Sequence, residues 1–353
     1  MNALAGSLAA IELADLSNSR LCDAIDEFVA RQDGSVLHQT RWLMAVEEGV
    51  GATARGLVAR RALEIVGWLP LSDVHSPIFG RALVSSGFAV SGGILAESSG
   101  IVHQMCLAAE ELARRLAAPS IELRGGSATT GWHQITGKHA NFAAPLAQSD
   151  DDQLLAIPRK ARAEVRKGLN NEFVIAVGRD AADRAAHYAV YAESVRNLGT
   201  PVFPRRLFAA VLDRFGGDAD ILTVRHEGKP VASVLSLYHR GTVMPFWGGG
   251  TWAARALRAN ERMYYELMCH ARRRGCTRFD FGRSKTGSGP YSFKKNWGFE
   301  PEPLSYWSWS ADAARARNID PTDAGYSARI ELWKRLPLPI ANRIGPWIAR
   351  GLG

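Results

Sequence analysis

The chain has 353 residues, of which 46% are hydrophobic and 22% charged, and its formal net charge is +8. This length exceeds one ordinary hydrophobic core and suits two domains. The charge is unevenly divided: residues 1–150 carry 11 Lys and Arg against 15 Asp and Glu, whereas residues 151–353 carry 32 against 20. The basic second part favours anionic ligands such as phosphates, a nucleic acid or an anionic lipid surface.

The signals of several protein classes are absent from the sequence. It contains no Walker lysine loop, no G-x-S-x-G elbow and no H-E-x-x-H motif, and its nine histidines show no metal-binding spacing, so we expect no metal. The N-terminus lacks the basic region of a secretory signal, and no apolar run approaches the roughly 20 residues that cross a bilayer. We therefore expect a cytoplasmic protein. Its four cysteines form no C-x-x-C pair and are expected to be buried, reduced thiols: Cys22, Cys106, Cys269 and Cys276.

Strand and helix signals alternate along the chain, which predicts an α/β protein with a mixed sheet. In the first half we predict a helix from Thr40 to Gly51, a hairpin over Leu57–Leu71, the glycine pair Gly92-Gly93, a helix over Ser99–Leu116 and a strand at Ile121-Glu122. The polar, acidic stretch Gln148–Asp152 predicts a domain boundary. The expected domains are 1–150 and 151–310, linked by a helix over Asp151–Asn171 and followed by a tail, 311–353.

The second half repeats this order. The predicted strands are Phe173–Val177, Ile221–His226, Val231–Tyr238, Val243–Trp247, Arg278–Phe281 and Leu304–Trp309. The predicted helices are one capped by Asp180 and running to about Leu198, then Arg205–Phe215, Leu257–Arg274 and Tyr291–Trp297. Any two α/β segments look somewhat alike. The shared order of helix, hairpin, glycine pair, long helix and strand nevertheless favours two copies of one domain.

The glycine run Gly248-Gly249-Gly250 is the first candidate for binding chemistry. It lies between a predicted strand and the helix that contains Asn260. Glycines let backbone N–H groups approach a ligand, and a helix N-terminus favours an anion. A tight turn or β-bulge explains a glycine triplet equally well.

A second candidate is the loop that follows the strand ending near Phe281, because open α/β sheets bind ligands at the carboxyl ends of their strands. Asp280 is the candidate to act as a base or to orient a cation. Arg283 and Lys285, with Ser284 between them, are candidates to bind a phosphate or carboxylate. A solvated loop with a charged tip is the alternative.

The helix beginning near Tyr291 is a third candidate. Neighbouring lysines on a helix point about 100° apart, so one can face inward, and we expect this to be Lys294. Tyr291 and Asn296 can donate hydrogen bonds to a developing oxyanion. A packed helix with solvated lysines is the alternative.

Two further segments carry cations. Arg159, Arg162 and Arg166 share one helix face and can bind phosphates, although a solvated face is the commoner role of such a stripe. Arg196 and Asn197, at the end of a helix, can bind an acceptor or simply cap that helix.

The tail from Leu332 to Arg350 is basic and aromatic. Peripheral contact with an anionic inner membrane is one interpretation. Because Pro337, Pro339 and Pro346 interrupt a long amphipathic helix, we favour packing against the domains.

The sequence resembles a known family at several of these segments. The runs YAESVRNLGTPVF (Tyr191–Phe203), FDFGRSK (Phe279–Lys285) and FKKNWGF (Phe293–Phe299), with the basic run Pro158–Gly168, resemble the FemAB-related proteins associated with the PEP-CTERM system. These form part of the larger GNAT-like set with a BioF2-like acetyltransferase domain. The resemblance covers nearly the whole chain and is densest from about residue 155 to residue 300.

This resemblance implies two tandem GNAT folds, as in Fem-type transferases, and a role in exopolysaccharide and cell-envelope assembly. Fem ligases move an amino acid from aminoacyl-tRNA onto a peptidoglycan precursor, and a lysine in their corresponding motif serves the reacting carbonyl, a role carried here to Lys294. The sequence departs from the pattern in two ways: it has no charged heptad arm for tRNA, and Gly248–Thr251 stands in place of the acetyl-CoA motif Q/R-x-x-G-x-G/A.

The resulting hypothesis is acyl transfer from acyl-CoA, with no metal, to an amine on a small, lipid-linked or glycan-linked acceptor. The first alternative is an aminoacyl-tRNA-dependent transferase, for which tRNA is the partner. The second is a non-catalytic binding module. DNA is not an expected partner.

Overall fold

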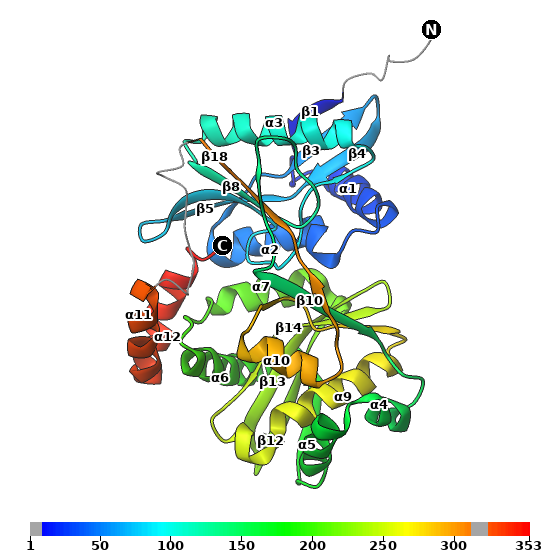
Figure 1. The fold of residues 1–353 in the computed structure, drawn as a ribbon, viewed down its shortest axis with the longest axis vertical. Coiled ribbons are helices and arrows are strands. Elements are labelled where there is room, and N and C mark those ends of the chain that lie inside the picture. Colours follow the sequence, from blue (N-terminus) through cyan, green and yellow to red (C-terminus); the bar gives the residue numbers. More distant parts are fainter. Residues whose placement is uncertain (1–8, 312–323) are drawn as a thin grey trace. The chain divides into compact units, whose positions relative to one another are not determined.

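The computed structural model describes residues 9–311 and 324–353. The N-terminal residues considered for a secretory signal and the start of the predicted tail lie outside these ranges. The chain forms two compact units (Figure 1). Unit 1 comprises the described parts of Met1–Thr136, Ser305–Ile319 and Arg350–Gly353, and unit 2 those of Gly137–Leu304 and Asp320–Ala349. Within the described ranges, no helix combines the length and apolar composition needed to cross a membrane.

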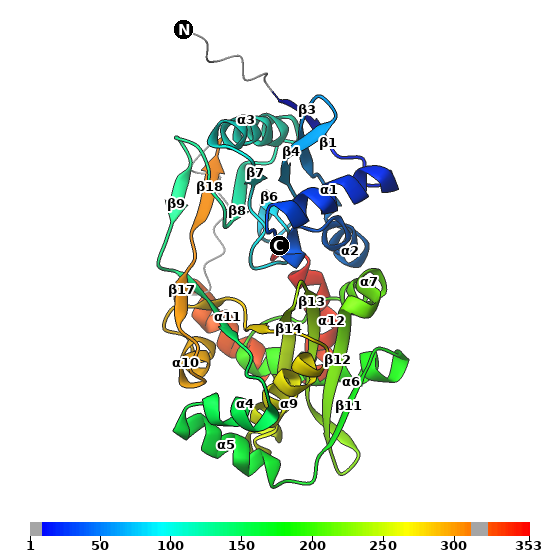
Figure 2. The same ribbon diagram turned by 90° about the vertical axis from the view of Figure 1, so that its right-hand side faces the viewer.

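Unit 1 contains two sheets, with strand orders β1-β3-β4-β7 and β2-β5-β6-β8-β18-β9. The last strand, β18, comes from far along the chain and lies between β8 and β9 (Figure 2). Its strands are β1 (Ala10–Leu13), β2 (Thr53–Ala54), β3 (Leu57–Arg61), β4 (Glu64–Leu69), β5 (Leu71–Ser76), β6 (Gly80–Ser85), β7 (Leu95–Ala96), β8 (Ser120–Arg124), β9 (His133–Ile135) and β18 (Tyr306–Ser310). Its helices are α1 (Ser19–Arg31), α2 (Thr40–Val50) and α3 (Ser99–Arg115).

Unit 2 is built on one mixed sheet of order β11-β12-β13-β14-β15-β10-β16, with β17 also paired to β10. Its strands are β10 (His139–Pro145), β11 (Val174–Gly178), β12 (Ala219–His226), β13 (Lys229–His239), β14 (Thr242–Gly250), β15 (Arg278–Asp280), β16 (Ser284–Lys285) and β17 (Pro301–Pro303). Its helices are α4 (Asp150–Ala156), α5 (Arg159–Leu169), α6 (Ala181–Leu198), α7 (Arg205–Phe215), α8 (Ala254–Leu257), α9 (Ala259–Arg273), α10 (Gly289–Asn296), α11 (Ala324–Arg335) and α12 (Leu338–Ala349).

Local sequence signals account for the helix that matters most to the site, α6. Asp180 caps its N-terminus and forms a reciprocal capping box with Asp183. Gly199, at φ 83°, ends it in the left-handed conformation that favours glycine. Both ends were predicted from the sequence and are confirmed.

The single helix predicted over Asp151–Asn171 is wrong. It is divided into α4 and α5, because Pro158 disfavours a helical conformation at Ile157, which is extended at φ −67° and ψ 129°. Pro158 then serves as the N-cap of α5.

The division of the chain differs from the expected boundary near residue 150. Strand β10 precedes the acidic stretch yet pairs with β15, β16 and β17 of unit 2. Strand β18 follows unit 2 in sequence yet pairs with β8 of unit 1. The acidic stretch contains the start of α4, and strand pairing over more than a hundred residues decides which unit each segment joins.

The core of unit 2 is rich in aromatic side chains. Phe279 is fully buried and packs at 4.9 Å, ring centre to ring centre, from Phe281. Phe281 in turn lies 4.8 Å from Tyr264 of α9 and 4.8 Å from Phe299. These contacts fasten α9 to the chain that follows β15.

Candidate functional site

The two parallel strands of unit 2, β14 and β15, diverge soon after they begin. They pair only at Thr242 with Arg278 and at Val243 with Phe279. Strand β14 then continues to Gly250, held along its other edge by β13. Among the described strands, none pairs with the free edge of β14 beyond Val243. The sheet is therefore open at the carboxyl ends of its parallel strands, where open α/β sheets bind ligands.

The glycine run forms the end of β14, so the predicted strand Val243–Trp247 is too short. A Cβ at Gly249 would lie 2.2 Å from Ser194 Oγ of α6, and one at Gly250 would lie 2.5 Å from Asn260 Oδ1 of α9. Neighbouring strand residues point to opposite faces, so α6 and α9 cover the two faces of the sheet. The close approach of both helices accounts for glycine at positions 249 and 250.

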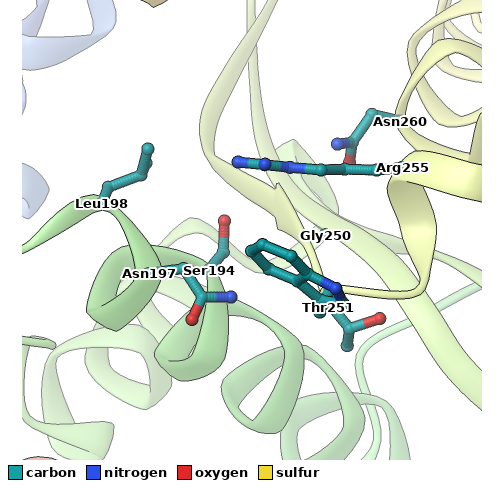
Figure 3. Close-up of a pocket in the computed structure, with 8 residues that line it drawn as sticks. Ser194, Asn197, Leu198, Gly250, Thr251, Arg255 and Asn260 are labelled. Carbon is teal, nitrogen blue, oxygen red and sulfur yellow. The ribbon is translucent and has the colours of Figure 1, made fainter. Parts of the chain in front are cut away.

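A pocket of about 150 Å³ lies at the end of β14. Figure 3 shows Ser194 and Asn197 of α6 on one side and Arg255 and Asn260 on the other. The lining is completed by Leu198, Gly250, Thr251 and Trp252.

The pocket offers polar groups to a ligand. Thr251 Oγ1 and Asn260 Oδ1 are buried and have no hydrogen-bond partner within the described residues. The guanidinium of Arg255 stacks 4.9 Å from the centre of the Trp252 ring. The Trp252 backbone N–H donates to Glu193 at 2.7 Å, which fixes the turn after the glycines. The Arg255 guanidinium and the Thr251 hydroxyl can donate to an anionic or polar group of a ligand, whereas Asn260 Oδ1 can accept from a donor on it.

Of the predicted binding residues, Asn197, Gly250 and Asn260 line this pocket, whereas Gly248 and Gly249 precede it on β14. Five lining residues were not predicted. Three of them, Thr251, Trp252 and Arg255, lie within five residues after the glycine run, and that position was the available signal. Ser194 lies one helical turn before Asn197, and Leu198 follows Asn197 directly.

Lys294 is buried, as predicted, with 9% of the residue exposed. Its Nζ donates to the backbone carbonyl oxygens of Phe281, Gly282 and Arg283 at 2.6, 2.9 and 3.1 Å. A protonated lysine has three donors, and here all three are used. The predicted role at a substrate oxyanion therefore needs correction, because Lys294 holds the loop after β15 and has no free donor for a substrate.

Asp280 lies at the start of the same loop. It accepts a hydrogen bond from the Gly282 N–H at 2.8 Å and another from the side chain of Asn141. Burial raises the pKa of Asp280. Burial also lowers the pKa of Lys294, to about 7, although the carboxylate of Asp280 opposes this shift. Asp280 and Lys294 thus both bind the backbone of the loop after β15, Asp280 through the N–H of Gly282 and Lys294 through three carbonyl oxygens.

Lys294, Asp280 and the loop after β15, together called the Lys294 cluster, lie in unit 2 but do not line the pocket. None of Asp280, Arg283 and Lys294 lines the pocket. Tyr264 lies between the two: it follows Asn260 by one turn of α9, its ring contacts Phe281, and its hydroxyl would lie 3.3 Å from a Cβ at Gly248.

The other predicted residues of the loop after β15 and of α10 differ in how far they are buried. Tyr291 packs its ring 5.1 Å from that of Phe142, and Asn296 is exposed on α10. The hydroxyl of Ser284 is buried and has no partner within the described residues. Arg283 and Lys285 are partly buried.

The cationic segments have structural roles or face solvent. Arg162 donates to the carbonyl oxygen of Leu155 at 3.0 Å, and Arg166 is exposed. Arg196 donates to the carbonyl oxygen of Lys334 at 3.0 Å. The predicted ligand contact of Arg196 is corrected, because its guanidinium anchors α11. All four cysteines are buried. No group of three or more His, Cys, Asp and Glu among the described residues could hold a metal ion.

Comparison with known proteins finds a family match within unit 2. Residues 158–295 match the acetyltransferase (GNAT) domain family. No curated protein matches the sequence. The crystal structure of FemX is similar at 15% identity, with a TM-score of 0.62 over 84% of this chain and 96% of that chain.

Two other solved structures share the fold. A tandem GNAT protein from the clavulanic acid biosynthesis pathway has 11% identity and a TM-score of 0.58, over 86% of this chain and 99% of that one. The C-terminal domain of a putative lysylphosphatidylglycerol synthetase from Agrobacterium fabrum has 12% identity and a TM-score of 0.56, over 89% and 94%. The predicted mixed α/β tandem fold is confirmed. Residues 158–295 match the acetyltransferase (GNAT) domain model.

Proposed function

We propose that unit 2 transfers an acyl group from a CoA thioester to a primary amine. The observation that carries this proposal is the opening between β14 and β15, with the polar pocket at the end of β14. A donor lying along the free edge of β14 can pair with the backbone groups that no described strand uses. Its polar part then reaches Arg255, Asn260 and Thr251.

The reaction needs no redox partner. The amine nitrogen attacks the thioester carbonyl carbon and gives a tetrahedral intermediate. The carbon–sulfur bond then breaks, an amide forms, and the proton released by the amine ends on the thiol of CoA. Positioning of the two reactants and the fixed dipoles of the β14 edge supply most of the catalysis. Lys294 and Asp280 act indirectly, because they hold in place the loop that borders the opening.

The proposed acceptor is an amine on a small molecule or on a lipid-linked or glycan-linked precursor. The resemblance to FemAB-related, PEP-CTERM-associated proteins supports a role in exopolysaccharide or cell-envelope assembly. The role in exopolysaccharide or cell-envelope assembly depends on this resemblance alone.

Donor binding by the full chain tests the proposal. Isothermal titration with acetyl-CoA should give saturable binding. Arg255→Gln should weaken that binding by about tenfold or more, because it removes a charged hydrogen bond. Arg206→Gln, which removes an exposed arginine on α7, is the control and should bind as the wild type does. If neither acetyl-CoA nor longer acyl-CoAs bind, the thioester donor is excluded and a non-catalytic module is favoured.

An aminoacyl-tRNA donor is the second candidate. The excess of positive charge in residues 151–353 and the exposed Arg159 and Arg166 on α5 favour it. Binding of tRNA should then weaken steeply as salt rises, and Arg159→Gln/Arg166→Gln should reduce the slope of log K against log salt by about 1 to 2. Salt-independent binding would exclude this candidate.

A further inference from the structure

Helix α12 buries one face against unit 2. Its buried residues, Ala341, Gly345 and Ala349, recur every four residues along one stripe. The helix lies close to its support: a Cβ at Gly345 would be 3.2 Å from the backbone nitrogen of Val202. The face that packs inward is thus made of small residues, and three large apolar residues of the helix, Ile340, Ile344 and Trp347, are exposed.

The opposite face of α12 is apolar and exposed. Ile340, Ile344 and Trp347 are 49%, 39% and 59% exposed and share one side of the helix. On α11, Leu332 is also 67% exposed. We call Ile340, Ile344 and Trp347 the outer apolar face.

Both helices are fixed to α6, so this face belongs to a defined surface. The carbonyl oxygen of Lys334 accepts the hydrogen bond from Arg196 of α6. A Cβ at Gly199 would lie 2.4 Å from Ile330 of α11, which shows how closely that helix packs on the end of α6. In Figure 1 the two helices lie beside α6 at the edge of unit 2.

The charge on α12 and on the residues that follow it has a single sign. From Leu332 to Gly353 the sequence has no Asp or Glu. Arg335 and Arg343 are exposed on α11 and α12, while Lys334 is paired with Glu331 at 2.6 Å. An anionic partner therefore fits this surface better than a neutral or cationic one.

We propose that the outer apolar face docks unit 2 onto an anionic lipid bilayer. Exposed Trp and branched aliphatic side chains beside arginines are typical of helices that lie in the membrane interface. A helix of 12 residues is about 18 Å long, too short to cross the hydrocarbon core, so α12 lies in the plane of the surface. A second copy of the chain is a poorer fit, because a symmetric interface would bring Arg343 near its own copy with no acid in this segment to offset the charge.

The test is flotation of the full-length protein with vesicles. Vesicles of phosphatidylcholine with 30% phosphatidylglycerol, roughly the anionic content that attracts basic segments, should bind the protein, and binding should fall as salt rises. Ile344→Gln/Trp347→Ser should reduce the bound fraction about tenfold. Arg343→Gln should reduce the affinity about fivefold.

The controls are matched to these changes. Leu63→Gln removes an apolar residue of unit 1 that is 93% exposed, and Arg206→Gln removes an exposed arginine; both should bind as the wild type does. Because the four native cysteines are buried, Ile340→Cys can be labelled with an environment-sensitive dye, which should shift to the blue on anionic vesicles while a label at Leu63→Cys should not.

Two outcomes would overturn the proposal. In one, phosphatidylglycerol vesicles bind no more protein than phosphatidylcholine vesicles do. In the other, light scattering shows a dimer that Ile344→Gln/Trp347→Ser converts to a monomer, which would assign the face to self-association. Acyl-CoA titration of the same variants keeps this result separate from the proposed enzymatic function.

Discussion

Lys294 stabilises the loop after β15 by donating to three successive carbonyl oxygens. Its Nζ also lies 5.5 and 5.7 Å from the centres of the Phe142 and Phe281 rings. The side chain thus joins β10, α10 and the loop that borders the proposed donor site. The arrangement assigns Lys294 a positioning role.

Lys294→Met keeps the length of the side chain but leaves those carbonyls without their donor. We expect the free energy of unfolding to fall by about 1 to 3 kcal/mol, the usual cost of orphaned buried polar groups. Chemical denaturation measures this change. Lys295→Met, at the exposed neighbouring lysine, is the control and should change stability little. Equal stability of the two variants would contradict the assigned role.

The pKa of Lys294 makes a second prediction at this scale. Burial lowers it from the ordinary value of 10.5 to about 7, so between these values the unfolded chain binds more protons than the folded chain. The free energy of unfolding should therefore rise from about pH 7 to about pH 10, by at most about 1.4 kcal/mol per pH unit. Urea unfolding at several pH values tests this. The free energy of unfolding should rise with pH in the wild type and in Lys295→Met. A Lys294→Met protein whose free energy of unfolding rises in parallel with theirs would refute the assignment to Lys294.

The sequence predicted some residues of the candidate site and not their roles. Neighbouring residues on a helix point about 100° apart, which allows one of the two adjacent lysines to point inward, and this was predicted for Lys294. Its acceptors are backbone carbonyls of a loop 11 to 13 residues earlier, and local sequence does not encode their orientation. For the same reason Arg196 was predicted to bind a ligand, although its acceptor belongs to α11, 138 residues away.

At the scale of elements, helices with clear end signals were predicted well. Helix α7 spans Arg205–Phe215 as expected, and α6 begins after Asp180. Strand β14 is longer than predicted because glycine has a weak strand preference, and the sequence alone does not reveal that two helices need the space. Tertiary packing therefore extends a strand that local propensity would end at Trp247.

The packing at Gly249 can be tested with a compensating pair. Gly249→Ala places a methyl group 2.2 Å from Ser194 Oγ and 2.6 Å from its Cβ, so α6 must shift. We expect a loss of about 1 to 3 kcal/mol in the free energy of unfolding, typical of overpacking. Adding Ser194→Gly removes both clashing atoms and should recover part of that loss, although a glycine inside a helix itself costs about 1 kcal/mol.

Thermal unfolding of the single and double variants measures this coupling. Gly217→Ala, at a glycine where a Cβ would meet nothing within 4 Å, is the control. Additive effects of Gly249→Ala and Ser194→Gly would show that the two residues do not contact each other in solution.

At the scale of the whole molecule, the tandem fold was predicted and the exchange of strands was not. The order of elements repeats along the chain, so duplication can be inferred from the sequence. The pairing of β10 with unit 2 and of β18 with unit 1 depends on contacts between distant segments. A boundary inferred from composition alone therefore separates strands that belong to one sheet.

This exchange predicts how unit 2 responds to truncation. Strand β10 pairs with β15, β16 and β17 and supplies the fully buried Phe142. A fragment of residues 151–304 lacks this strand, so β16 and β17 lose their partner and β15 keeps only β14. A fragment of residues 137–304 keeps it. We expect only the longer fragment to unfold cooperatively on heating and to elute as a single species.

Circular dichroism and size-exclusion chromatography distinguish these outcomes. Both fragments lack α11 and α12, so their difference reports the contribution of the segment that carries β10. A version of the longer fragment with 139–145 replaced by a Gly-Ser linker of equal length separates pairing from chain length and should behave as the shorter fragment does. If residues 151–304 unfold with the same midpoint as 137–304, then β10 adds nothing to unit 2, and the composition-based boundary near residue 150 describes the folding units better than the strand exchange does.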